Sequence, residues 1–162
     1  MTISLPSALN DLERRIARLE DIEAIRRLKF EYCRVCDDAH NTDSIVELFT
    51  EDGIWESAGQ AGLHRGVHRG REAIRAVFAS FGQQISLSQH NVMNPAIDVA
   101  DDGLTAEGVW YFLGMFEYPG DDPSLLFVRY EETYRKVGDR WLFQHLRAIA
   151  SRKFALPTGT IS

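Results

Sequence analysis

Two short motifs in the sequence contain residue types that bind metals or carry out redox chemistry. Cys33 and Cys36 form a Cys-x-x-Cys, and four positions separate His64 from His68. A structural zinc site needs about four ligands, and the sequence has no second pair of cysteines. A redox cysteine normally opens a helix, whereas Cys33 and Cys36 lie well inside a helical pattern. We therefore expect two ordinary thiols.

His64 and His68 lie in the glycine-rich segment 59–70, which has no periodicity and no carboxylate or cysteine at a metal-binding offset. We interpret it as a loop over the mouth of a pocket, where His64, His68 or Arg65 contacts ligand. The sequence also lacks a glycine-rich nucleotide fingerprint, a nucleophile elbow and a P-loop. It therefore predicts neither a metal nor a cofactor.

The first half of the sequence shows helical periodicity. From Asp11 to Cys36 apolar residues recur every three or four positions, which predicts one long helix. Thr42 or Asp43 can cap a short helix over 44–49, and residues 71–81 resume the helical spacing. Three helices are therefore expected, and the charged residues between the apolar ones are interpreted as solvated faces.

The second half of the sequence predicts strands. Residues 85–99, 104–118, 125–137 and 141–151 are rich in β-branched and aromatic residues, and a short strand begins at Ile54. The connections between the four long segments are short turn sequences that favour antiparallel hairpins. Helices followed by such a meander describe an α+β domain, with the helices on one face of a curved sheet.

Length and charge limit the class of protein. A chain of 162 residues fits one domain, 1–162, in which we expect 1–10 and 155–162 to be loose termini. The net charge of −6 argues against a nucleic-acid partner. No apolar stretch approaches the roughly 18 residues of a membrane span, and no leader pattern occurs. We therefore expect a cytoplasmic protein with no membrane partner.

Five stretches of the sequence resemble the SnoaL-like branch of the nuclear-transport-factor-2-like superfamily: LEDIEAIRRL, VELFTEDGIW, GREAI, HNVMNP and WLF. The resemblance implies a cone, in which three N-terminal helices pack on a strongly curved mixed, mainly antiparallel β-sheet around a pocket. Scytalone dehydratase, bile-acid dehydratase and hexachlorocyclohexane dehydrochlorinase look like the nearest functional models. Because the superfamily also contains isomerases and non-catalytic binding proteins, the site must decide the function.

The catalytic candidates follow from this resemblance. The three model enzymes share an aspartate late in the first helix and a histidine on the first long strand, positions that Asp37 and His90 occupy here. The resemblance implies that His90 removes a proton and that Asp37 orients the imidazole and stabilises its charged form. Without the resemblance, His90 would be interpreted as a strand histidine that bonds to a backbone carbonyl, and Asp37 as a residue of the polar end of a helix.

Further site residues are less constrained by the sequence. The resemblance suggests that Tyr32 and Arg147 stabilise an oxygen that leaves or gains charge. A core aromatic and a solvated strand residue are the alternatives for these two positions, because a bulge would reverse the inward face of the last strand. Our candidates for substrate contact are Trp55, Trp110, Phe112, Arg129 and His64.

The resulting hypothesis is a cofactor-independent lyase that acts on a hydrophobic, hydroxylated aromatic or polycyclic small molecule, in aromatic compound catabolism. Dehydratase-type elimination is the default, and formaldehyde-releasing C–C cleavage is a variant of it. An isomerase of ketosteroid type and a non-catalytic module for hydrophobic-ligand binding or oligomerisation are the alternatives. From the resemblance we expect a homotrimer, with a homodimer as the alternative.

Overall fold

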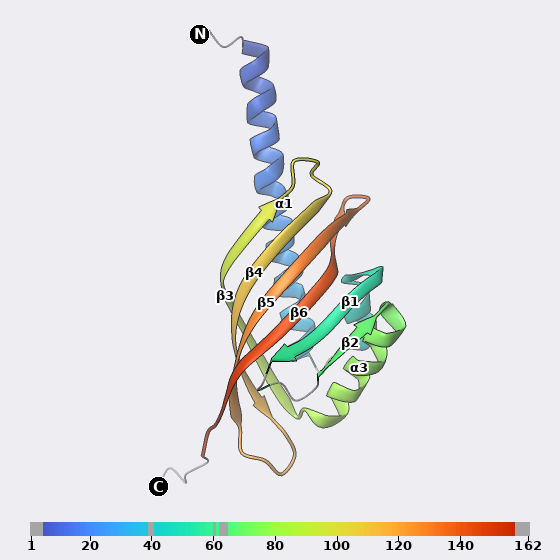
Figure 1. The fold of residues 1–162 in the computed structure, drawn as a ribbon, viewed down its shortest axis with the longest axis vertical. Helices are drawn as coiled ribbons and strands as arrows, with labels where there is room; N and C mark the ends of the chain where they lie inside the picture. Colours follow the sequence, from blue (N-terminus) through green and yellow to red (C-terminus); the bar gives the residue numbers. More distant parts are fainter. Residues whose placement is uncertain (1–4, 39–40, 60, 62–64, 158–162) are drawn as a thin grey trace.

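The computed structural model describes residues 5–38, 41–59, 61 and 65–157. These residues form three helices and six strands (Figure 1). In chain order the elements are α1 (Leu5–Asp37), α2 (Thr42–Val46), β1 (Phe49–Gly59), β2 (Gly66–Arg69), α3 (Arg71–Gln84), β3 (Leu87–Val99), β4 (Thr105–Glu117), β5 (Ser124–Val137) and β6 (Arg140–Ala155).

All six strands belong to one sheet with the order β2-β1-β6-β5-β4-β3. The last four strands of the chain form an antiparallel meander, as their short turns predict. β1 then joins the far side of β6 in parallel, and β2 pairs antiparallel with β1. The expected mixed, mainly antiparallel sheet is therefore confirmed, and only the β1–β6 pair is parallel among the described strands.

The helices bury their apolar faces against this curved sheet. On α1 the buried face begins at Asp21 and continues to Cys36, at the three-and-four spacing of one helical side. α3 contributes Ile74, Val77, Phe78 and Phe81 to the same core. The first part of α1 extends beyond the end of the sheet (Figure 1). None of the helices described is both long enough and apolar enough to cross a bilayer.

Four sequence predictions differ from the structure. β1 begins at Phe49 rather than at Ile54. Residues 5–10, expected to be loose, are the start of α1. The short helix spans Thr42–Val46 rather than 44–49, because Asn41 caps it by accepting a hydrogen bond from the backbone N–H of Ser44 at 3.2 Å. Within the segment interpreted as a loop, β2 pairs with β1 from Ile54 to Ser57.

Candidate active site

A small cavity lies between α1, α3 and the inner face of the sheet. Its volume is about 100 Å³, which is below the roughly 300–1,000 Å³ typical of small-molecule sites. Aromatic and aliphatic groups form most of its wall, and His90 and a few hydroxyl and thiol groups supply the polar atoms. The lining residues are Tyr32, Cys36, Trp55, Ser57, Phe78, Phe81, Ile85, His90, Phe112, Phe116, Tyr118, Leu126, Val128, Tyr130, Ala148 and Ala150.

The end of α1 and the beginning of β3 bring Asp37 and His90 together. Asp37 Oδ1 lies 2.5 Å from His90 Nδ1, and Asp37 Oδ2 accepts the backbone N–H of His90 at 2.9 Å. Ser88, on the same face of β3, donates to the backbone oxygen of Cys36 at 3.1 Å and lies 3.3 Å from Asp37 Oδ1. The aspartate therefore contacts both the ring and the backbone of the histidine, which fixes the imidazole orientation.

Burial and hydrogen bonding act in opposite directions on Asp37. Burial raises the pKa of the carboxyl, but hydrogen bonds from the ring and backbone of His90, its charge and the Ser88 hydroxyl together bring the pKa below its usual 3.8. The carboxylate therefore stays ionised at neutral pH, although helix C-termini disfavour negative charge. The His90 side chain is only 7% exposed and packs against Phe112 and Phe116, at ring-centroid distances of 4.9 and 5.6 Å.

Tyr32 lies on the cavity side of α1, one and a half turns before Asp37. Its hydroxyl accepts a hydrogen bond from Trp55 Nε1 at 3.0 Å. Burial, with the neighbouring Cys36 and Tyr130, raises the pKa of Tyr32 well above 10. The phenol therefore remains protonated at neutral pH and is a hydrogen-bond donor within the cavity.

Both cysteines of the Cys-x-x-Cys are buried free thiols. Burial raises the pKa of Cys33 to about 11 and that of Cys36 well above its usual 9.0. Such thiols have little thiolate character, which redox chemistry and metal binding both require.

Arg147 does not line the cavity, contrary to our expectation. It lies on the outer face of the sheet, where its guanidinium bonds to Glu56 at 2.9 Å and Glu131 at 3.0 Å. The physical reason is a bulge: Tyr134 pairs with Phe143 and Thr133 with His145, so that Gln144 is an additional residue in β6. This residue reverses the alternation that starts at Trp141 and turns Arg147 outward.

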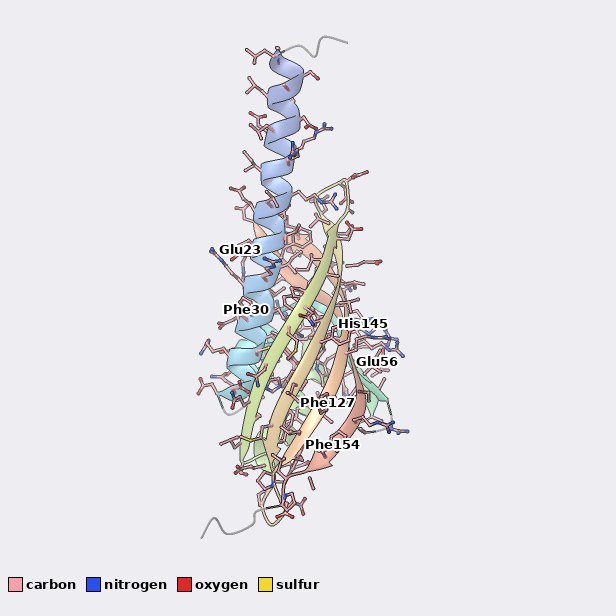
Figure 2. All side chains as sticks on the ribbon, turned by 90° about the vertical axis from the view of Figure 1, so that its left-hand side faces the viewer. Glu23, Phe30, Glu56, Phe127, His145 and Phe154 are labelled. Carbon is pink, nitrogen blue, oxygen red and sulfur yellow. The ribbon has the colours of Figure 1, made fainter. Side chains whose placement is uncertain are left out.

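The outer face also carries Arg129, another of our candidates, and a histidine, His145. Arg129 pairs with Glu131 at 2.5 Å and is absent from the cavity wall. His145 Nε2 lies 3.0 Å from Glu56 Oε2, and both side chains are visible together on this side of the sheet in Figure 2. The molecule therefore holds a second histidine–carboxylate pair, remote from the cavity.

The remaining candidates for substrate contact separate into three groups. Trp55 and Phe112 line the cavity. Trp110 lies in the core instead, where its Nε1 donates to the Tyr134 hydroxyl at 3.0 Å. His64 lies outside the described residues, and His68 contacts the Trp55 ring at a centroid distance of 5.7 Å. In the part of the chain that is described, no group of three or more His, Cys, Asp or Glu residues is arranged to hold a metal.

Our sequence analysis missed several residues at or near the site. Leu126 and Val128 form part of the wall, and alternation along β5 from Tyr130 was the available signal. It also missed the buried pair of Lys29 and Glu132, whose atoms Nζ and Oε1 are 2.5 Å apart. A lysine on the apolar side of α1 was the only sign of this pair.

Comparison with known proteins shows the family. A family model described as a SnoaL-like domain matches residues 17–147. The chain belongs to this family. No curated protein matches this SnoaL-like chain. Our assignment to the SnoaL-like branch of the nuclear-transport-factor-2-like superfamily is thereby confirmed, together with the cone-like α+β fold.

Solved structures share the fold of the SnoaL-like chain at low sequence identity. A protein from Novosphingobium aromaticivorans, provisionally named a scytalone dehydratase, is 22% identical, with a TM-score of 0.74 and coverage of 91% of this chain and 99% of that one. Hexachlorocyclohexane dehydrochlorinase (LinA) Type2 is 16% identical, with a TM-score of 0.78 and coverage of 91% and 97%. The structural neighbours therefore include dehydratase-type and dehydrochlorinase-type proteins.

Proposed function

We propose that this protein is a cofactor-independent lyase in which His90 is the general base and Asp37 its orienting partner. The observation that carries the proposal is the 2.5 Å contact of His90 Nδ1 with Asp37 Oδ1 at the wall of an apolar cavity. A carboxylate on one ring nitrogen fixes the tautomer and stabilises the imidazolium that forms when the other nitrogen takes a proton. The dehydratase-type structural neighbours are consistent with this chemistry.

The proton would be taken by Nε2 of His90. Nδ1 is engaged by Asp37, and the described residues offer Nε2 no hydrogen-bond partner within the chain. In a β-elimination, Nε2 removes a proton from carbon, the electron pair forms the double bond, and the C–O bond breaks at the neighbouring carbon. The imidazolium then returns the proton to the departing hydroxide, which leaves as water.

Tyr32 would assist at an oxygen atom of the substrate. Its hydroxyl already accepts from Trp55, so its own proton can be donated to substrate. A phenol in an apolar site stabilises developing negative charge more strongly than it would in water. We therefore assign Tyr32 the role of hydrogen-bond donor to a carbonyl or leaving oxygen. Arg147 has no part in this mechanism, because it lies on the other face of the sheet.

The cavity limits the class of substrate. Its wall is mainly aromatic and aliphatic, which favours a hydrophobic ligand with few polar groups. A cavity of roughly 150 Å³ with apolar walls is known to hold one benzene ring, so the present cavity of about 100 Å³ must widen to hold even a single ring. We infer that the substrate is a hydroxylated aromatic or alicyclic ring whose entry moves the wall, and that a polycyclic substrate requires a larger movement.

Mass spectrometry of a panel of hydroxylated aromatic and alicyclic compounds tests the proposal. Wild type, His90→Ala and Asp37→Asn are incubated in parallel with the same compounds. We expect a product lighter by water with the wild type, and a loss of about 10³-fold or more in turnover with each variant. A product lighter by formaldehyde would identify C–C cleavage, and an unchanged mass with altered retention would identify an isomerase.

The outer-face pair supplies a matched control. His145→Ala removes a histidine that also contacts a carboxylate, but at a position remote from the cavity. Turnover should therefore survive this change, while all three variants keep a melting temperature close to that of the wild type. Full activity of His90→Ala on an identified substrate would refute the assignment. Tight retention of one compound without conversion would favour the non-catalytic binding module.

A further inference from the structure

The exposed first part of α1 carries a continuous apolar stripe. Leu5, Leu9, Leu12, Ile16 and Leu19 are 74%, 51%, 50%, 47% and 66% exposed, respectively, although large aliphatic side chains normally avoid water. We call these five residues the α1 stripe. The stripe begins in the first part of α1, which projects past the end of the sheet (Figure 1).

The spacing of the α1 stripe is that of a coiled-coil seam. Successive members are separated by four, three, four and three positions, the heptad pattern of alternating d and a residues. Leucine occupies every d position, and Leu9 and Ile16 occupy the a positions. An apolar seam of this kind packs against an equivalent seam on another helix, knob into hole.

The stripe faces away from the rest of the molecule. Ile16 precedes the fully buried Ile25 by nine positions, and nine steps of about 100° place the two on opposite sides of the helix. Glu23 and Phe30 continue this outer side, and Figure 2 shows both pointing away from the sheet. Arg18 lies on the inner side, where it bonds to Asp98 at 2.5 Å. A second helix can therefore lie along the stripe without meeting the sheet.

We propose that a second copy of this chain covers the α1 stripe, forming a parallel two-stranded coiled coil. The charges that flank the stripe favour this occupant and this orientation. Arg15 occupies a g position, and Glu20 the following e position, which face each other across a parallel dimer. Both residues are exposed, and neither has an ion-pair partner within the described chain. Each dimer would thus gain two such interchain pairs.

The antiparallel arrangement is disfavoured by the same charges. It would place e positions opposite e positions, so that Glu13 of one copy approaches Glu13 of the other, and it would separate Arg15 from Glu20. In the parallel arrangement the two globular parts lie on opposite sides of the helix pair, because each stripe faces away from its own sheet. The residues from Asp21 onward already fold against the sheet, so pairing need only order the first part of α1.

Light scattering coupled to size-exclusion chromatography tests the proposal on the full chain. We expect Leu12→Glu/Ile16→Glu to lower the particle mass of the wild type, by half where each assembly is a pair joined through the stripe. The control Ser7→Glu/Asn10→Glu adds the same two carboxylates to the other side of the exposed helix, and should leave the mass unchanged. Retention of the wild-type melting temperature and of the near-ultraviolet circular dichroism, to which the aromatic residues of the globular part contribute, establishes that the variants are folded.

Charge reversal tests the pairing itself. Arg15→Glu and Glu20→Arg should each weaken association about tenfold at low salt, because each turns two attractive interchain contacts into repulsive ones. The double variant Arg15→Glu/Glu20→Arg should restore the wild-type association. This rescue is independent of any effect that glutamates in the seam have on folding.

A disulfide distinguishes the orientation. Leu19→Cys brings two thiols together in a parallel dimer and should cross-link under mild oxidation, whereas an antiparallel pair centred on Leu12 places residue 19 beside residue 5 of the other copy. The native thiols are buried and do not interfere. An unchanged mass in Leu12→Glu/Ile16→Glu would overturn the proposal. So would a monomeric wild type that sediments with phosphatidylcholine–phosphatidylserine vesicles, since the stripe would then bind a lipid surface.

Discussion

The buried ion pair of Lys29 and Glu132 should dominate the stability of the wall behind the cavity. Both side chains are completely buried, with Nζ and Oε1 2.5 Å apart. The second oxygen of Glu132 accepts the hydroxyl proton of Tyr134. Lys29 Nζ also lies 3.3 Å from the ring centroid of Tyr130 and 4.8 Å from that of Tyr32, two residues that line the cavity. Removal of either charge therefore leaves the other buried and unpaired beneath the candidate site.

The expected magnitude follows from this burial. Removing one partner of a buried ion pair costs about 3–5 kcal/mol, because a desolvated charge is left without compensation. We expect this loss in Glu132→Leu and in Lys29→Met. In a domain of this length it corresponds to a decrease in Tm of about 6–20 °C. The double variant Lys29→Met/Glu132→Leu leaves no buried charge and only the hydroxyl of Tyr134 without its acceptor, so it should lose about 1–3 kcal/mol.

Urea unfolding of the wild type, both single variants and the double variant forms a double-mutant cycle that measures the coupling. The control is Arg27→Met, which removes an exposed helical cation paired with Glu23 at 3.3 Å and should leave the free energy of unfolding nearly unchanged. The reasoning is refuted if the decrease in the free energy of unfolding of the double variant equals the sum of the decreases in the two single variants. It is equally refuted if each single variant loses less than about 1 kcal/mol.

Three further predictions concern the cavity and its neighbours. The folded-state pKa of Asp37 lies below its unfolded value, so its contribution to stability is present above about pH 4 and lost at lower pH. The difference in free energy of unfolding between wild type and Asp37→Asn, measured with urea, should therefore shrink in that acidic range. Cys33 and Cys36 should react with a thiol reagent such as dithionitrobenzoate only after denaturation, because their pKa values are raised by burial; rapid labelling of the native protein would contradict this. Gly114→Ala places a Cβ 2.1 Å from Cζ of Phe112, so that this ring must move. We expect the turnover of any substrate that the panel identifies to decrease by a larger fraction than the free energy of unfolding does.

Much of the fold was predictable because local signals agree with the tertiary structure. β4 spans Thr105–Glu117, within one residue of the strand expected over 104–118. The turns that bound the long strands place Gly103 and Gly138 at positive φ, 65° and 59°, a conformation that favours glycine. By contrast, β2 is a four-residue edge strand with no apolar alternation, and it exists only through its pairing with β1. No local pattern indicates such a strand.

The candidate site was predictable only in part, for two physical reasons. Asp37 and His90 are 53 positions apart, so the sequence alone does not show that their side chains meet, and the family resemblance supplied that expectation. For Arg147, a single additional residue at Gln144 decides the outcome, because it reverses which face the following side chains occupy as far as Ala150, before the next register shift in β6. The catalytic roles of His90, Asp37 and Tyr32 remain predictions.

The parallel pairing of β1 with β6 has a consequence for how the chain is synthesised. β1 is the first strand to leave the ribosome, yet its partner on the sheet's interior side is the sixth. A nascent chain that has reached only Asp139 therefore holds two separate fragments, a β1–β2 hairpin and a β3–β4–β5 meander, each with an unpaired edge. Such edges are sites of mispairing between chains. Ala148 and Ala150 complete the cavity wall from β6, so the cavity is complete only after this strand has joined the sheet.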